Sequence, residues 1–195
     1  MADLYERSID GAGDGALLVH SGKVKHALSW SRDGFLIFNV LRKGVELWAV
    51  PVKEPKKAVP LLQGGSYYLD AEFSPDGRWV AYASNESSRF EVYVKSFSEG
   101  RLGAGGKVSA NGGGRPRWGQ DGKLYYIGLN NKLVRIKLAL GSAIQPGTPK
   151  ELFTAPSSDW APSADAKRFL FLVPQQQQPT PLTVVLNWQA ALKPK

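Results

Sequence analysis

The sequence predicts an all-β protein built from about four copies of a four-stranded unit. The first observation is a repeat in the 195-residue chain, at 27–34, 70–77, 115–122 and, with more differences, 159–166. Counted at the position of Ser31, successive copies lie 43, 45 and 44 residues apart. The second observation is that no stretch has the spacing of a long amphipathic helix. A constant period of this length is typical of β-propeller blades.

Each copy is centred on a tight turn, most clearly the Ser-Pro-Asp-Gly of 74–77. Proline sets φ at the second turn position, aspartate hydrogen-bonds to the nearby backbone, and glycine accepts a positive φ. The fourth copy has Ala164 and Ala166 where Pro and Gly stand in the second, so its turn geometry is less well determined. We expect four aspartates to be turn residues: Asp33, Asp76, Asp121 and Asp165.

Short runs rich in Val, Ile, Tyr, Phe and Trp flank these turns and are expected to be strands. Runs that follow the turns directly span 35–40, 78–84, 123–127 and 167–173. Second runs span 45–52, 90–97, 133–138 and 182–188. Further strands are expected at 58–62, 107–110 and 150–154. Together with the segment before each turn, this gives four strands per blade, ordered outward from the pore.

A single propeller domain is expected over the whole chain. Its blades are predicted at about 26–62, 68–110, 114–154 and 158–188, after partial third and fourth strands within 4–20. The strand at 16–20 would complete the last blade and so close a four-bladed ring. Alternatively, two chains close a ring of eight blades with two-fold symmetry, and we favour this dimer. An open half-ring would expose apolar blade faces.

An aromatic side chain recurs one residue before each of the first three turns. These residues are Trp30, Phe73 and Trp118. Because a wedge of space between neighbouring blades must be filled by large side chains, we expect all three to be buried.

Composition and charge limit the classes of function. The chain has no cysteine, which excludes disulfides and thiolate chemistry. The net charge is +8, but the basic residues are scattered, so a solvated basic surface is expected and a nucleic-acid partner is not. There is no apolar run of the roughly 18 residues that a membrane span needs, and no apolar stretch at the N-terminus. No membrane insertion is expected, and a cytoplasmic location is the default.

The motif Phe-Ser-Pro-Asp-Gly-Arg-Trp-Val-Ala-Tyr at 73–82 resembles the TolB-like, WD-repeat-like (PD40) bacterial β-propellers. Segments 84–87, 91–94, 115–118 and 182–188 are most similar to the C-terminal propeller of acidobacterial-type serine/threonine protein kinases. This resemblance implies a propeller over nearly the whole chain, a sensor or scaffold role, and an extracytoplasmic location. The kinase motifs are absent: the chain lacks the Gly-rich nucleotide loop, His-Arg-Asp and Asp-Phe-Gly.

Catalytic and metal-binding patterns are also missing from the sequence. His20 and His26 are the only histidines, and no Gly-x-Ser-x-Gly elbow is present. The turn aspartates lie on separate blades, so they cannot share a metal ion, and no calcium-loop spacing surrounds them. We therefore expect neither metal nor cofactor, and a protein that is not an enzyme.

Binding at the mouth of the central channel is the function that the pattern favours. Loops and inner-strand residues are expected to meet there: His26, Tyr67, Tyr68, Asp70, Glu72, Arg115, Arg117, Asp159 and Trp160. Aromatic side chains with both signs of charge are typical of a surface that binds a protein or peptide. One alternative is a hydrolase or lyase acting in the channel through Glu72. Another is a half-propeller whose role is to pair with itself.

Overall fold

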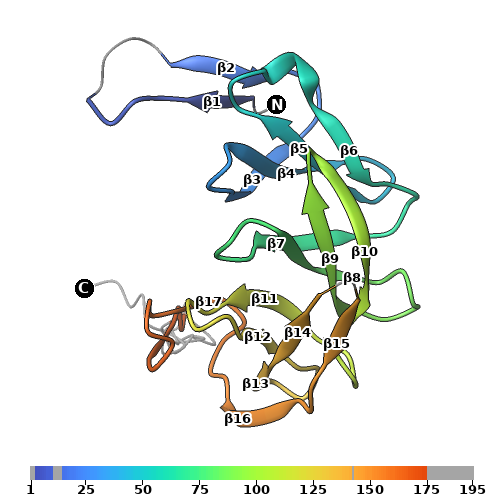
Figure 1. Cartoon of the computed structure of the whole chain (residues 1–195), viewed down its shortest axis with the longest axis vertical. Helices are drawn as coiled ribbons and strands as arrows, with labels where there is room; N and C mark the ends of the chain where they lie inside the picture. Colours follow the sequence, from blue (N-terminus) through green and yellow to red (C-terminus); the bar gives the residue numbers. More distant parts are fainter. Residues whose placement is uncertain (1–2, 11–14, 142, 175–195) are drawn as a thin grey trace, which may run out of the picture.

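The computed structural model describes residues 3–10, 15–141 and 143–174. Figure 1 shows small β-sheets arranged side by side in an arc, with the N-terminal strands at one end and β17 (Trp160–Pro162) at the other. Three of the sheets have four antiparallel strands each. Apart from strands, the described residues contain one turn of 3₁₀ helix, η1 (Pro55–Lys57). The predicted all-β fold with four-stranded blades is confirmed.

Within each complete blade the strands follow one another outward from the inner strand. Blade 1 consists of β3 (Lys25–Trp30), β4 (Phe35–Leu41), β5 (Val45–Pro51) and β6 (Val59–Leu62). Blade 2 consists of β7 (Tyr68–Phe73), β8 (Trp79–Ser84), β9 (Glu91–Ser98) and β10 (Arg101–Lys107). Blade 3 consists of β11 (Gly114–Trp118), β12 (Leu124–Ile127), β13 (Lys132–Ile136) and β16 (Lys150–Thr154).

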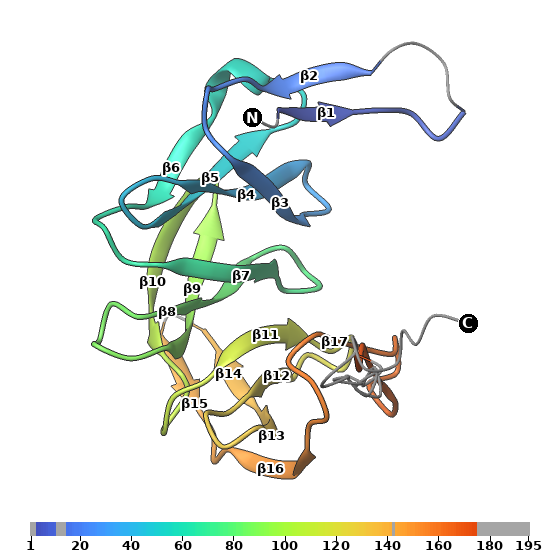
Figure 2. The ribbon, with the colours of Figure 1, turned by 180° about the vertical axis from the view of Figure 1, so that it is seen from behind.

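Two-stranded sheets lie at the two ends of the arc. β1 (Leu4–Glu6) pairs with β2 (Ala16–Val19) against blade 1, and β17 pairs with β18 (Phe169–Phe171). In Figures 1 and 2 these pairs lie far apart. The four-bladed alternative, in which 16–20 completes the last blade of the same chain, is not formed by the described residues, because β2 pairs with β1 at the opposite end. The predicted third strand of that blade, 182–188, lies outside the described residues.

The turn motif forms as its sequence predicts. In the second copy, the Gly77 N–H donates to the Ser74 carbonyl at 2.8 Å, and Gly77 has a φ of +74°. The Ser74 hydroxyl donates to Asp76 Oδ1 at 2.5 Å, and the same carboxylate oxygen accepts the Arg78 N–H at 3.2 Å. The Asp76 carboxylate thus forms its hydrogen bonds within its own turn, as expected.

The fourth turn keeps this pattern although its proline and glycine are lost. Ser163 donates to Asp165 at 2.5 Å, and the Lys167 N–H donates to Asp165 at 3.1 Å. Ala166 takes the glycine position with a φ of +52°, a region that costs a residue with a Cβ roughly 1 kcal/mol. Hydrogen bonding of the turn therefore holds Ala166 in a strained backbone conformation.

We expect the substitution Ala166→Gly to stabilise the protein by about 0.5–1 kcal/mol, because glycine adopts a positive φ without strain. Urea denaturation of the full chain measures this difference. The matched control is Gly77→Ala in the second turn, which should destabilise by a similar amount although its Cβ position meets only Ser31 and Asp33 side-chain atoms at 3.8 Å, an ordinary van der Waals distance. A loss of stability in Ala166→Gly would contradict backbone strain at Ala166.

One strand prediction needs correction, and one hairpin was not predicted. The outer strand of blade 2 is β10, at Arg101–Lys107, and not 107–110. Glu99 and Gly100 both have positive φ, +50° and +77°, so the chain turns back at once as in a two-residue type I′ hairpin. Blade 3 also contains an unpredicted hairpin between β13 and β16, formed by β14 (Leu138–Leu140) and β15 (Ile144–Pro146).

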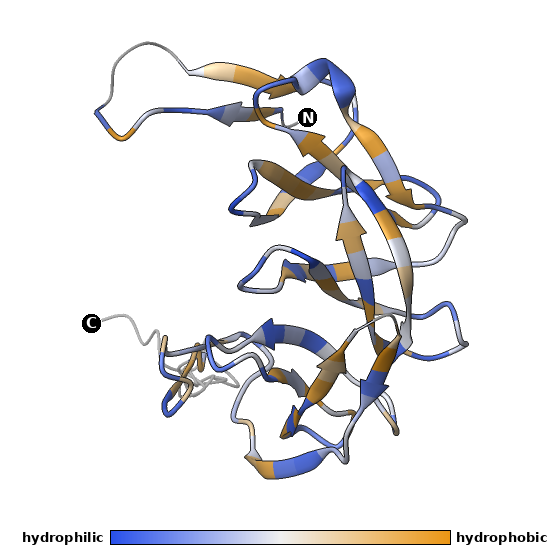
Figure 3. Cartoon of the chain, viewed as in Figure 1, coloured by the Kyte–Doolittle hydropathy of each residue, from blue (hydrophilic) through white to orange (hydrophobic). Residues whose placement is uncertain are grey.

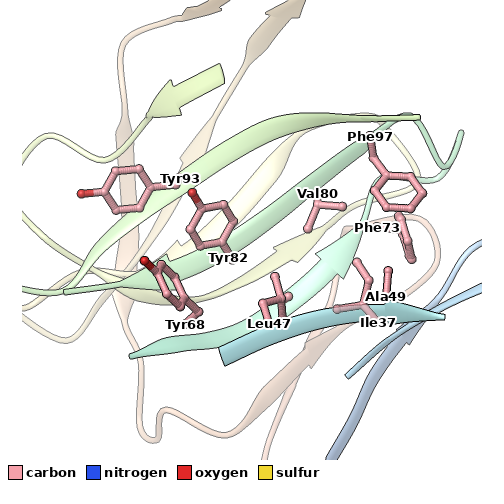
Figure 4. Packing of buried hydrophobic residues seen from close by; sticks show 10 residues of the cluster. Ile37, Leu47, Ala49, Tyr68, Phe73, Val80, Tyr82, Tyr93 and Phe97 are labelled. Atoms are coloured by element: carbon pink, nitrogen blue, oxygen red, sulfur yellow. The ribbon is translucent and has the colours of Figure 1, made fainter. Parts of the chain in front are cut away.

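The core lies between the blades. Figure 3 shows hydrophobic residues along the strands of blades 1 and 2, whereas β11 is banded with hydrophilic ones. Figure 4 shows the cluster between blades 1 and 2, where Phe73 and Phe97 meet edge to face with ring centroids 4.9 Å apart. Trp118 is buried between blades 2 and 3. Trp30 is instead 53% exposed, which corrects the prediction, because the described residues place only the β1–β2 hairpin beyond blade 1.

Candidate functional site

The inner strands β3, β7 and β11 form one continuous wall, since β7 contacts both of the others. A cleft of about 360 Å³ opens on this wall and takes residues from all three blades. Ser29 of β3, Asp70 and Glu72 of β7, and Arg117 of β11 line it. The cleft is where three blades bring side chains from distant parts of the sequence together.

A backbone irregularity at equivalent positions of β7 and β11 shapes the wall. Pairing of β7 with β8 shifts register between Leu69 and Glu72, and pairing of β11 with β12 shifts between Gly114 and Arg117. Within these bulges Asp70 and Arg115 have positive φ, +54° and +53°. A bulge re-aims the side chains of its strand, and strain of this kind is concentrated at functional sites.

Two acid–base pairs join β7 to β11 at these bulges. Arg115 Nη1 donates to Asp70 Oδ1 at 2.9 Å. Arg117 Nη1 lies 3.8 Å from Glu72 Oε2, too far for a hydrogen bond, and donates to the Pro116 carbonyl at 2.9 Å. Arg115 and Asp70 are therefore hydrogen-bonded to each other, whereas Arg117 and Glu72 are not. The Arg117 guanidinium keeps N–H groups that can donate to another acceptor.

Glu72 is the electrostatically unusual group of the cleft. Its side chain is only 28% exposed, and burial raises its pKa to about 7 although the nearby Arg117 and the Trp118 N–H lower it. Its Oε2 atom is buried and accepts no hydrogen bond from the described residues. The carboxyl group therefore gains and loses its proton near neutral pH, and it can act as donor or acceptor.

Ser29 ties the blade 1 side of the cleft to blade 2. Its hydroxyl accepts the Phe73 N–H at 3.1 Å, across an interval of 44 residues. This bond fixes β3 against β7 at the level of Glu72. The side-by-side placement of Ser29, Glu72 and Arg117 follows from their equivalent positions in the repeat.

Two of the predicted binding residues belong to the core instead. Tyr68 is buried, lies edge to face with Tyr82, and donates its hydroxyl to the Gln63 carbonyl at 3.2 Å. Trp160 is buried and packs on Phe169 and Phe171. Neither side chain is available to a partner, which corrects both predictions.

The remaining predicted residues are exposed but do not line the cleft. Tyr67 precedes β7 and donates its N–H to Asn85 Oδ1 at 2.9 Å. His26 lies near the start of β3, and Asp159 lies just before β17 at the other end of the arc. The structure thus brings together Asp70, Glu72, Arg115 and Arg117, and leaves His26, Tyr67 and Asp159 outside the cleft.

A buried carboxylate that the sequence did not single out holds the connection between blades 2 and 3. Glu91, 1% exposed at the start of β9, accepts hydrogen bonds from Arg89 Nε at 2.8 Å, Ser109 Oγ at 2.5 Å and the Gly112 N–H at 2.8 Å. Burial alone would raise its pKa, but these bonds outweigh burial and the pKa is lowered. Its sequence signal is a charged residue opening the apolar run Glu-Val-Tyr-Val.

The described residues contain no group of three or more His, Asp or Glu side chains that could hold a metal ion. They also contain no helix long and apolar enough to cross a membrane.

No protein-family model and no curated protein sequence matches the chain. Solved structures do match, and they include TolB structures, whose fold is a β-propeller.

Two of these are TolB structures. TolB from Acinetobacter baumannii is 14% identical with a TM-score of 0.65, over 89% of this chain and 43% of that one. The putative TolB from Agrobacterium tumefaciens is 16% identical with a TM-score of 0.54, over 74% and 54%. A prolyl endopeptidase matches with a TM-score of 0.44, at 20% identity over 71% and 22%. The fold is thus a TolB-like propeller, and the chain spans about half the length of the TolB structures.

Proposed function

We propose that this chain is a non-catalytic binding module that takes a protein or peptide segment into the cleft on its inner strands. The observation that carries the proposal is the double acid–base arrangement across β7 and β11, held by two strained bulges. A buried core position would not need such charges, because paired charges in a core cost desolvation. Charges maintained at an open cleft are instead available to a partner.

The chemistry of the cleft favours a peptide that carries both polar donors and acceptors. Arg117 has spare donors for a carboxylate or carbonyl, and Glu72, with its pKa raised to about 7, accepts or donates as the partner requires. The two pairs together have no net charge when Glu72 is ionised and one positive charge when it is protonated, so most of the chain's overall charge of +8 lies elsewhere. Recognition would therefore depend on the placement of hydrogen bonds more than on bulk attraction.

The assembly that contains this module is also a proposal. The described chain is an open arc that spans about half of the TolB structures, and two copies would supply the blades of an eight-bladed ring. A place beside a kinase domain, as the sensor propeller of a bacterial kinase, rests on the sequence resemblance alone. Light scattering at several protein concentrations measures whether two copies associate.

Substitution at Arg117 tests the binding function. Peptides selected by the full chain from a displayed random library should lose about tenfold in affinity towards Arg117→Ala, a change of about 1.4 kcal/mol. The matched control is Arg32→Ala, at an exposed turn of blade 1, which should bind as the unsubstituted chain does. Selection of no peptide, or equal binding to both variants, would remove the cleft as the binding site.

A second function is favoured by one observation, the pKa of Glu72 of about 7. A buried carboxyl group with such a pKa is suited to general acid–base catalysis, as a channel hydrolase or lyase would need. The cleft offers one such carboxyl beside one arginine. Turnover of an ester or glycoside substrate that disappears in Glu72→Gln would favour this function over binding alone.

A further inference from the structure

A cleft of about 570 Å³ lies on the outer part of blade 3, where the chain passes from β15 into β16 (Figure 1). It is lined by residues 147–149 of this connection, by Arg135 and Lys137, and by Lys150 and Glu151 at the start of β16. None of these residues lines the inner-strand cleft. We call it the basic cleft.

Three cationic side chains meet at the basic cleft although they are spread over sixteen positions of the sequence, from 135 to 150. Arg135 and Lys150 are direct partners in the antiparallel pairing of β13 with β16. Lys137 stands two residues beyond Arg135, so in an extended chain both project to the same side. Opposed residues have Cβ atoms roughly 5 Å apart, and residues two apart along a strand are separated by about 7 Å. All three positive groups are therefore within reach of one bound group.

The three cations have no acidic partner among the described residues. None of them takes part in any ion pair there. Arg135 lies beside the Tyr125 hydroxyl, which donates to Asp121 Oδ2 at 3.3 Å, but Asp121 has Lys123 as its ion-pair partner. The sequence 175–195, which follows the described residues, contains no aspartate and no glutamate. It therefore supplies no acidic side chain to the basic cleft.

Glu151 is the one acidic residue in the lining of the basic cleft, and it faces another way. Its register partner is Val134, whereas that of Lys150 is Arg135, so the two side chains leave β16 on opposite faces. Glu151 Oε1 accepts a hydrogen bond from Asn130 Nδ2 at 2.9 Å. The lining thus carries three positive charges and one negative charge, and an excess of positive charge is left at the cleft.

The direct opposition of Arg135 and Lys150 is unfavourable for the sheet. Like charges at directly opposed positions of an antiparallel pair are destabilising, and opposite charges are stabilising. An anion bound between the two side chains would replace this repulsion by attraction to both. The arrangement is therefore complete only when a negative group occupies the cleft.

We propose that the basic cleft binds a phosphate group through Arg135, Lys137 and Lys150. A phosphate carries more negative charge than a carboxylate and offers three oxygens, one for each cationic side chain. The Thr148 hydroxyl, which also lines the cleft and forms no hydrogen bond with another described residue, is a further donor. The phosphate is either free or carried on a phosphorylated side chain. The site is separate from the inner-strand cleft, and its test does not depend on the function proposed for that cleft.

Titration of the full chain with inorganic phosphate tests the site directly. At constant ionic strength, set with chloride, the ³¹P resonance should show a saturable change at millimolar concentration. Lys150→Glu should weaken binding at least about tenfold, because it removes one cation and adds an anion. The matched control is Lys43→Glu, at the exposed turn between β4 and β5, which changes the net charge equally and should bind as the unsubstituted chain does.

Urea denaturation of the same variants separates loss of the site from damage to the fold. Without phosphate, Lys150→Glu should unfold at a higher urea concentration than the unsubstituted chain, because a carboxylate opposite Arg135 replaces repulsion by attraction. Phosphate should raise the urea midpoint of the unsubstituted chain and of Lys43→Glu, and leave that of Lys150→Glu unchanged.

A peptide distinguishes the two sources of phosphate. The probe is a fluorescein-labelled Gly-Ser repeat with one phosphoserine, compared by fluorescence anisotropy with its unphosphorylated form, which should not bind. Affinity above that of inorganic phosphate assigns the site to a phosphorylated protein, and equal affinity assigns it to the free anion. The absence of any saturable response to phosphate, or an equal response in Lys150→Glu and Lys43→Glu, would overturn the proposal.

Discussion

The variant Glu91→Ala should lose about 3 kcal/mol of unfolding free energy, the largest single effect that we expect outside the apolar core. Removal of the carboxylate leaves the buried Ser109 hydroxyl and Gly112 N–H without their acceptor. It also releases the link between β9 and the segment that connects blades 2 and 3. Urea denaturation at neutral pH measures the loss.

The pH dependence of this loss has a definite sign. Since the folded-state pKa of Glu91 is lowered below its usual value of 4.5, its stabilisation is fully present above pH 4.5 and disappears as the pH falls through the folded-state pKa. The gap between Glu91→Ala and the unsubstituted chain should therefore narrow in acid. Glu54→Ala, at an exposed residue with Lys57 as its ion-pair partner, is the control and should cost less than about 0.5 kcal/mol. An equal loss of unfolding free energy in Glu91→Ala and Glu54→Ala would contradict a stabilising role for the hydrogen bonds of Glu91.

The opposite behaviour is expected for Glu72→Gln, which should be more stable than the unsubstituted chain by about 2 kcal/mol at pH 8. Burial raises the folded-state pKa of Glu72 from 4.5 to about 7. The folded state therefore holds its proton over a range in which the unfolded state has lost it. Stability of the unsubstituted chain then falls as the pH rises from about 4.5 to 7, and glutamine removes this loss.

Denaturation at pH 4 and pH 8 separates this effect from a simple change in packing. At pH 4 both chains carry a neutral side chain at position 72, so their stabilities should be nearly equal. Glu54→Gln, on the surface, should show little difference at either pH. An advantage of Glu72→Gln that is the same at both pH values would mean that burial of charge is not its cause.

The blade pattern could be predicted from the sequence because it depends on local chemistry. Turn residues such as Asp76 and Gly77 act within a few residues, and the 44-residue period shows which turns are equivalent. Even the altered turn at Ala166 keeps its geometry, since Ser163 and Asp165 are sufficient to form its hydrogen bonds. The outer strand β10 was misplaced because its glycines, which weaken the strand signal, hide an extended segment.

Only part of the candidate site could be predicted from the sequence. Equivalent positions in the repeat placed Ser29, Glu72 and Arg117 on one wall, and the cleft brings them together. The roles of Tyr68 and Trp160 were wrong because burial depends on how neighbouring blades pack, which strand periodicity does not show. The bulges escaped prediction for another reason: their positive-φ positions carry Asp70 and Arg115, where glycine or asparagine would be the usual signal.

At the bulges of β7 and β11, the backbone determines the shape of the inner wall and the side chains determine its charge. Backbone torsions set the direction in which positions 70 and 115 project, so the path of the strand does not depend on which charged side chain stands there. Asp70 and Arg115 could therefore be interchanged, with their ion pair kept and the electric field along the wall reversed. The exchange would reverse the direction of the dipole along the wall while the net charge of the pair stays at zero.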